Sequence, residues 1–120
     1  MTLQYAILVY EGEAEQAVRE ADGPAQAEAH AAYRAYTEAL VAAGVLRGGE
    51  QLDLPHTATT VTAVPGQPLQ VQDGPFADTK DQLAGLFVIE VANLDEAIAW
   101  AARCPAAATG RVEIRPVVLS

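Results

Sequence analysis

Two segments of the chain are apolar on both of their alternating sides, and this pattern constrains the fold more than any other feature. Residues 1–10 and 83–91 each carry apolar side chains at odd and even positions alike. Successive side chains of a strand point to opposite sides of a sheet, so a strand with this pattern has both sides covered. The two segments are therefore predicted to be central strands of a sheet.

Two helices are predicted between and after these strands. Gly23 and Pro24 mark the start of the first, which ends at Gly44. The second follows Asn93, a residue that can cap a helix through the amide of Glu96, and it stops before Pro105. Residues 11–22 are expected to form an acidic loop. The expected buried stripes are Ala25, Ala29, Ala32, Tyr36, Leu40 and Ala43 in the first helix, and Leu94, Ala97, Ile98, Ala101 and Ala102 in the second.

The remaining segments indicate strands nearer the edges of the sheet. Residues 45–54 read as an extended segment interrupted by Gly48 and Gly49, and residues 57–64 and 69–72 as the two arms of a hairpin. Residues 111–117 alternate apolar and charged side chains and include Pro116, which has no amide for an interior strand. This last segment is therefore predicted to be an edge strand.

The order of these elements predicts one α+β domain over residues 1–120, with a ferredoxin-like antiparallel sheet and its helices on one face. The chain offers no further element to cover the apolar side chains of the other face. A second copy of the same chain is the economical cover, so a homodimer is expected.

Composition narrows the classes of partner. The formal charge of −9 and the sequence pI of about 4.4 oppose direct binding to nucleic acid or to an anionic membrane. Residues 1–10 lack the basic start of a signal peptide, and no apolar run is long enough to span a membrane, so a cytoplasmic location is expected. The single cysteine, Cys104, reads as a structural thiol.

A motif in the second half of the chain carries a family resemblance. Residues 73–83, with the letters DGPFADTKDQL, resemble the signature of the DGPF group of YCII-related proteins, and further similar landmarks extend the match over nearly the whole chain. Asp78 and Asp81 stand where the signature usually has Glu. The resemblance implies a ferredoxin-like fold paired into a dimeric α/β barrel, and a His and Asp pair in a pocket.

The resemblance selects His30 and Asp73 as the candidate catalytic pair. His30 lies at the border of the apolar stripe of the first helix, and Asp73 would orient its ring for proton transfer. Taken without the family, Asp73 and Gly74 form a turn that Phe76 anchors in apolar surroundings, and His30 is an ordinary surface residue. Both readings stay open at this point.

Lys80 and Arg115 are candidates for holding an anionic or phenolic substrate, although pairing with nearby carboxylates is the simpler alternative for each. The second histidine, His56, follows a proline in a loop and has no metal-ligand spacing around it. The sequence holds no phosphate loop, nucleophile elbow or metal cluster, so no cofactor and no metal are expected.

Two functions of different class follow. The first is a small-molecule enzyme, lyase-like or hydrolase-like, or a ligand-binding protein, which would work by acid and base chemistry without a cofactor. The second rests on the resemblance alone, because the DGPF group is often encoded beside extracytoplasmic-function sigma factors. It would make the chain a regulatory protein with a partner in a sigma-factor pathway.

Overall fold

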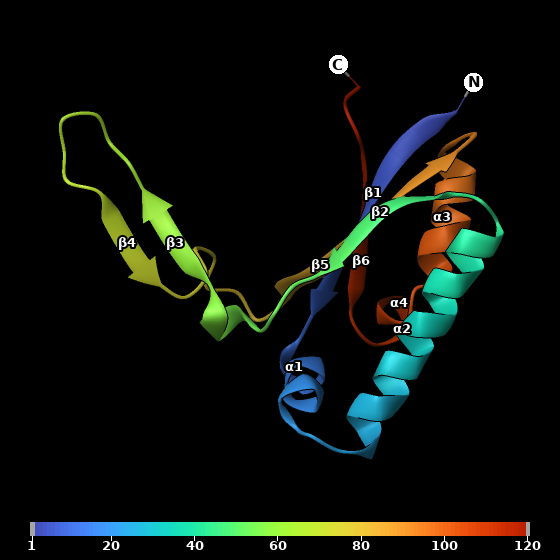
Figure 1. Cartoon of the computed structure of the whole chain (residues 1–120), viewed down its shortest axis with the longest axis horizontal. Helices are drawn as coiled ribbons and strands as arrows, with labels where there is room; N and C mark the ends of the chain where they lie inside the picture. Colours follow the sequence, from blue (N-terminus) through green and yellow to red (C-terminus); the bar gives the residue numbers. More distant parts are fainter. Residues whose placement is uncertain (1, 120) are drawn as a thin grey trace.

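The computed structural model describes residues 2–119, so Met1 of the predicted first strand and Ser120 lie outside the described residues. A four-stranded antiparallel sheet, with strand order β2-β5-β1-β6, forms the centre of the fold (Figure 1). Its strands are β1 (Leu3–Glu11), β2 (Leu46–Gln51), β5 (Gln82–Val91) and β6 (Arg111–Pro116). The helices pack on this sheet, and the ferredoxin-like α+β fold predicted from the sequence is confirmed.

The two strands predicted to be central, β1 and β5, are the inner strands of the sheet. On the side that faces the helices, Ile7 and Ile89 are fully buried, because α2 (Pro24–Ala42) and α3 (Leu94–Arg103) cover them. On the other side, Leu8 pairs with Leu86 and both are only half-buried. We call this second side the open face; it also carries Ala6 and Val88.

Residues 11–22 do not form the acidic loop that was predicted; most of them form the helix α1 (Glu13–Glu20). The segment is poor in large apolar residues, so its sequence resembles a solvated loop. A tertiary contact explains why it folds. Arg19 in the last turn of α1 donates hydrogen bonds to the carboxylate of Glu11 and to the backbone oxygen of Leu52. A second short helix that was not predicted, α4 (Ala106–Thr109), follows Pro105.

The helices bury narrower stripes than the sequence suggests. In α2 only Tyr36 and Leu40 are buried, and the alanines predicted at 25, 32 and 43 are exposed. Large side chains can reach the sheet from this helix, and the short alanines cannot. In α3 only Ala97 and Ala101 are buried, while Leu94 and Ile98 remain about half exposed. The small alanine face lets this helix lie close to the sheet, which turns the larger side chains aside.

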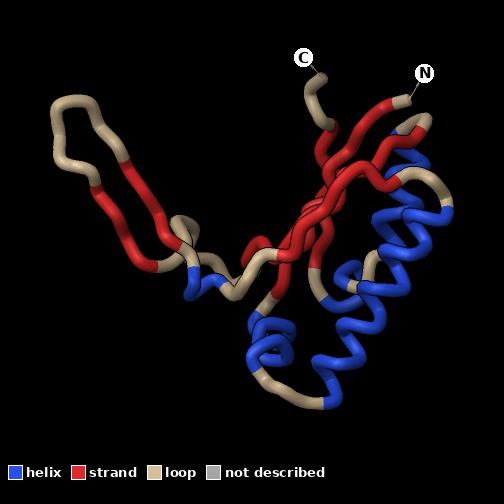
Figure 2. The backbone as a smooth tube through the Cα atoms, viewed as in Figure 1, coloured by secondary structure: helices blue, strands red, loops and turns tan. Residues whose placement is uncertain are grey.

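The predicted hairpin exists, but it stands apart from the main sheet (Figures 1 and 2). It consists of β3 (Thr59–Thr62) and β4 (Gln70–Asp73), which pair only with each other, and a 3-10 turn, η1 (Pro55–Thr57), precedes it. At its base the amide of Gly74, which has a φ of +98°, donates to the oxygen of Ala58 at 2.7 Å. We call residues 58–74 the arm.

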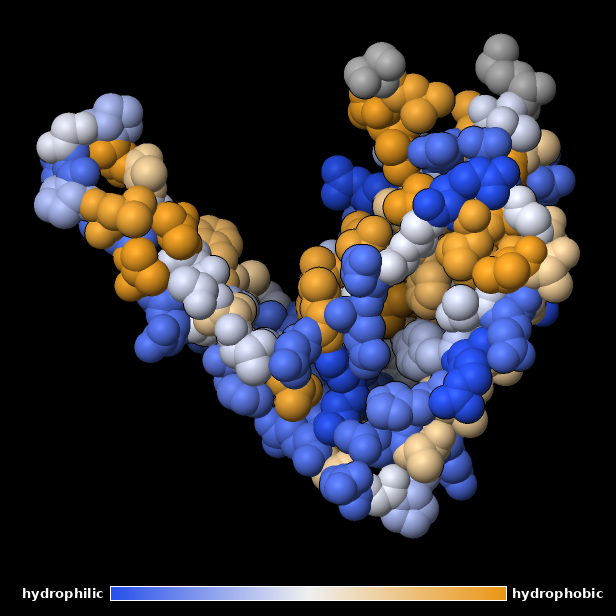
Figure 3. Space-filling view, viewed as in Figure 1, coloured by the Kyte–Doolittle hydropathy of each residue, from blue (hydrophilic) through white to orange (hydrophobic). Residues whose placement is uncertain are grey.

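The arm and the sheet form the two sides of a V, and the space-filling view shows the hollow between them (Figure 3). The open face of the sheet is turned toward this hollow, because the helices lie on the opposite side. Phe76, just beyond the base of the arm, is 87% exposed. The predicted anchoring of its ring in apolar surroundings is therefore wrong for the single chain, since no layer of the chain lies over this position.

Candidate functional site

A cavity of about 740 Å³ lies between α2 and the sheet. Its walls come from α1, α2 and strands β1, β2 and β5. The elements α3, α4 and β6 do not line it. The N-terminal half of α2 crosses above the sheet without packing its alanines onto it, which leaves this volume open. The chain thus has a concave site of the size that binds small molecules.

One end of the cavity contains a buried ion pair. Glu11 continues the alternation of buried positions along β1, and it is 8% exposed. A carboxylate at a core position needs a charged partner, and the guanidinium of Arg19 supplies it. Arg19 is bonded to Glu11 Oε1. Within residues 2–119 no buried side-chain oxygen lacks a partner, so Glu11 Oε2, to which the structure gives no hydrogen bond, is not fully buried.

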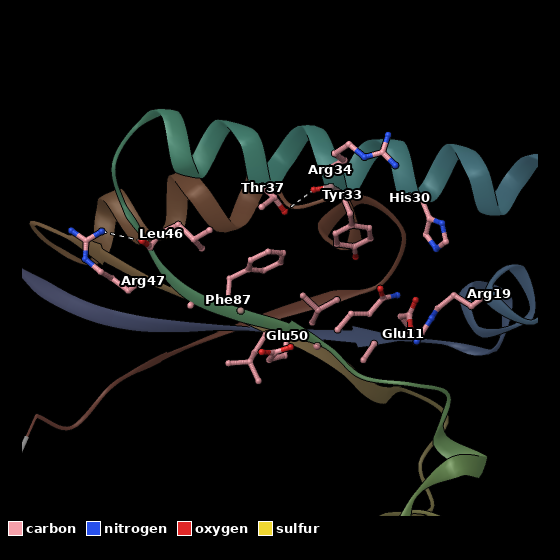
Figure 4. A pocket seen from close by; sticks show the side chains of 17 residues that line it. Glu11, Arg19, His30, Tyr33, Arg34, Thr37, Leu46, Arg47, Glu50 and Phe87 are labelled. Atoms are coloured by element: carbon pink, nitrogen blue, oxygen red, sulfur yellow. Dashed lines mark hydrogen bonds and ion pairs between the residues drawn. The ribbon is translucent and has the colours of Figure 1, made fainter.

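His30 faces the same end from the opposite wall. It lies on α2 one turn before Tyr33 and two turns before Thr37, all on the cavity side of the helix. The close view shows its ring pointing toward the Glu11 and Arg19 pair (Figure 4). The residue itself is exposed, because the cavity is open to solvent at this end. Of the predicted His and Asp pair, His30 is thus at the rim of this cavity, and its catalytic role stays a prediction.

The middle of the cavity is lined by aromatic side chains. Tyr33 points from α2 toward the sheet, and the ring of Phe87 points up from β5 (Figure 4). Burial raises the pKa of Tyr33, and the neighbouring Cys104 and Glu11 raise it further. The phenol therefore stays protonated at neutral pH and can act as a hydrogen-bond donor. Phe87 is held edge-on against Tyr36, with 5.3 Å between the ring centroids.

The other three predicted site residues lie away from the cavity lining. Asp73 is the last residue of β4 in the arm, where it is exposed and pairs with Thr59. Lys80 is exposed in the segment before β5. Arg115 lies on the open face of the sheet, and its guanidinium is 3.6 Å from the carboxylate of Glu113. A single chain thus brings His30 to the cavity without bringing Asp73, Lys80 or Arg115 there.

Sequence reasoning missed Glu11 and Arg19. The segment that contains them was taken as a loop, so the continued alternation of β1 to position 11 was not used. That alternation is the one signal that could have shown a carboxylate pointing to the helix side of the sheet.

The thiol of Cys104 lies close behind the cavity. The residue is 2% exposed, and burial raises the pKa of the thiol, which keeps it protonated and unreactive. Its prediction as a structural thiol agrees with this burial. Among residues 2–119 no group of three or more His, Cys, Asp or Glu side chains is arranged to hold a metal ion. The same residues contain no helix that is long and apolar enough to cross a membrane.

Comparison with known proteins places the chain among its relatives. Residues 3–119 match the model of the YCII-related domain. A protein of Rhizobium meliloti (strain 1021), described as uncharacterized protein R00369, is 36% identical over 119 residues. That alignment covers 96% of this chain and 92% of the relative, so the similarity extends over most of both chains.

Proposed function

The chain belongs to the YCII-related family, and we propose that it binds a small organic molecule in the cavity under α2 and transfers protons on it without a cofactor. His30 is the general acid and base of this proposal. The observation that carries it is the meeting of three ionisable side chains, Glu11, His30 and Tyr33, on one cavity from two different elements.

The chemistry of these groups supports proton transfer. Histidine is the side chain that most readily gains and loses a proton near neutral pH. Tyr33 remains a donor because its pKa is raised, and it can hold a carbonyl or enolate oxygen of the ligand. Phe87 and Leu46 offer an apolar surface for the carbon skeleton. In a lyase-like reaction His30 takes a proton from one carbon of the ligand and gives it to the group that leaves. In a hydrolase-like reaction it takes the proton from an attacking water and gives it to the leaving group.

Two carboxylates compete for the role of orienting His30. Asp73 is the one that the family resemblance selects, but it is absent from the cavity lining of its own chain. Its pairing with His30 therefore requires a second copy of the chain or another position of the arm. Glu11 lines the same cavity as His30 in one chain, and only its Oε1 is bonded to Arg19. We favour Glu11 for this reason. Lys80 and Arg115 remain predicted contacts for an anionic substrate. Since neither lines the cavity of its own chain, these contacts require a second copy of the chain.

The two histidines of the chain allow a direct test. A set of small hydroxylated and carboxylated aromatic compounds is screened by NMR on protein with ¹⁵N-labelled imidazoles. We expect compounds that bind to shift the ring signals of His30 and not those of His56, which lies outside the cavity, 3.9 Å from the carboxylate of Glu20. Binding that shifts both rings equally, or only His56, would contradict the proposed site.

Substitutions then separate the roles. His30→Gln should abolish any proton exchange that the protein catalyses on a bound compound, whereas His56→Gln should leave it unchanged. Glu11→Gln should lower the affinity for the compound at least tenfold, and Asp73→Asn should change that affinity by less than about twofold. The opposite ranking of these two variants would assign the orienting carboxylate to Asp73.

The second copy of the chain is proposed as the partner of the open face. Ala6, Leu8, Leu86 and Val88 lie there in the two central strands, and no element of residues 2–119 covers them. Apolar side chains on an uncovered sheet face mark an interface in a protein of this size. The alternative function, regulation through a partner in a sigma-factor pathway, is not favoured by any feature of residues 2–119.

A further inference from the structure

The arm has an unusual composition for an exposed element. Residues 57–72 contain no acidic, basic or histidine side chain, although such residues occur throughout the rest of the chain. An exposed edge strand is normally protected by charges, most often lysine, which prevent it from pairing with other chains. Depletion of charge is instead typical of the buried centre of a protein interface. The composition of the arm is therefore that of a contact surface.

The arm has one apolar and one polar side. Val61 and Val71 are direct cross-strand partners, so their side chains lie together on one side. Leu69 stands two positions before Val71, immediately before the strand begins. Thr60 and Gln72 form the neighbouring pair and point to the other side. The three apolar residues are 57%, 61% and 63% exposed. Hydrophobic side chains gather visibly along the arm in the space-filling view (Figure 3).

Such a hairpin is not stable by itself. Two strands without a third strand or a packed layer are marginal in water, because the hydrogen bonds of the ladder do not offset the entropy of ordering the chain. The arm lacks that support within its own chain, since β3 and β4 pair with no strand of the main sheet. Burial of its apolar side against another molecule would supply the missing free energy.

The shape of the molecule indicates which molecule that is. The arm and the open face border the same hollow, and each carries apolar side chains over which no other element of residues 2–119 lies (Figures 1 and 3). A copy of the chain that places its open face against this one fills the hollow. Two-fold symmetry then makes the contact mutual, so that each copy lies within the V of the other. A charge of −9 on each copy repels the other, which favours a contact through the uncharged residues 57–72 and the apolar central strands of the open face. The charges on the outer strands of that face, Glu50, Glu113 and Arg115, lie beside these central strands.

We propose that the arm clasps a second copy of this chain, with the side formed by Val61, Leu69 and Val71 packed against the copy that occupies the hollow. The arm is then a second contact, separate from the pairing of the open faces and independent of the ligand site at His30. It becomes fully ordered only in the dimer.

A matched pair of substitutions tests the arm. Val71→Lys and Gln72→Lys introduce the same charge at adjacent exposed positions, the first on the apolar side and the second on the polar side. Sedimentation equilibrium over nanomolar to micromolar concentrations measures the dimer dissociation constant. We expect Val71→Lys to raise this constant at least tenfold and Gln72→Lys to change it by less than about threefold. Circular dichroism spectra that match the wild type would show that both variants are folded.

A third variant distinguishes the arm from the open face. Leu8→Lys places a charge on the open face and should also disrupt the dimer. If Leu8→Lys disrupts the dimer while Val71→Lys dimerises like the wild type, the faces pair without the arm and the clasp is overturned. A wild-type chain that is monomeric at these concentrations overturns it as well, because another molecule or the chain itself must then cover the arm. None of these results depends on the ligand proposed for His30.

Discussion

The body of the molecule, which is the four-stranded sheet with its helices, and the arm both contain paired antiparallel strands, yet only the body has a core. In the body, Ile7, Leu40 and Ile89 are fully buried between the sheet and α2. In the arm, Val61 and Val71 pair just as regularly and remain more than half exposed. The difference shows that hydrogen-bonded pairing defines a strand, whereas the layer packed on it provides its stability. The body holds that layer within one chain, and the arm must find it elsewhere.

The largest effect is expected when a substitution in the core is compared with one in the arm. Leu40→Ala removes a fully buried side chain and leaves a cavity, which should lower the free energy of unfolding by about 2–5 kcal/mol. Val71→Ala should lower it by less than about 0.5 kcal/mol in the monomer. Urea denaturation at a protein concentration below the dimer dissociation constant measures both. A loss of several kcal/mol from Val71→Ala would show that the arm packs within its own chain.

Alkaline pH should also destabilise the body selectively. Burial raises the pKa values of Tyr33, Tyr36 and Cys104 above those of the unfolded chain. The nearby Cys104 and Glu11 raise the pKa of Tyr33 further. The folded state therefore keeps these groups protonated, so stability is fully present below the unfolded pKa values and falls as the pH rises above them. The loss should begin near pH 8.5 with the cysteine and steepen above about pH 10 with the tyrosines, by about 1.4 kcal/mol per group and pH unit.

Urea denaturation at pH 7, 9, 10 and 11 measures this loss, and Tyr36→Phe provides its control. The variant should be less stable at pH 7, because the hydroxyl of Tyr36 donates to the backbone oxygen of Trp100 at 2.8 Å, but its stability should fall less steeply above pH 10. The arm contains no titratable side chain between residues 57 and 72, so it cannot cause the transition. Equal slopes for the wild type and Tyr36→Phe would remove this tyrosine from the explanation.

The sequence predicted the body of the fold well because burial leaves a repeating pattern. The two strands that are apolar on both sides are central, and Asn93 begins α3 as expected. The errors arise where tertiary contacts replace pattern. The helix α1 depends on Arg19 reaching Glu11, which no local pattern shows. The hairpin was predicted, but its separation from the main sheet was not. A strand shows the same alternation of apolar and polar residues when its own chain covers it and when another chain does.

The candidate site was predicted less completely than the fold, for a related reason. His30 was found through its place on the helix and through the family resemblance, and it does line the cavity. Glu11 and Arg19 come from different elements eight residues apart, and their meeting depends on how α1 turns back over β1. Whether Asp73 reaches a histidine depends on where the arm of a second copy lies. A cavity assembled from distant segments is visible only once those segments are placed.

The smallest effects are expected from removing one exposed carboxamide side chain in the body and one in the arm. The side chain of Asn93 accepts a hydrogen bond from the backbone amide of Glu96 at 2.9 Å, and Glu96 in turn accepts one from the amide of Ala92. Asn93→Ala should therefore cost about 1 kcal/mol of unfolding free energy, because a helix amide loses its partner. Asn93→Asp keeps the acceptor and should restore most of that loss.

The matching change in the arm is Gln70→Ala, which also removes an exposed amide side chain, from a strand that caps nothing. We expect no change beyond about 0.3 kcal/mol in urea denaturation of the monomer, because the arm does not take part in the cooperative unfolding of the body. A loss from Gln70→Ala as large as that from Asn93→Ala would mean that arm and body unfold together. The contrast between the two regions would then lie in their exposure alone, and the arm would already be stable without a second copy.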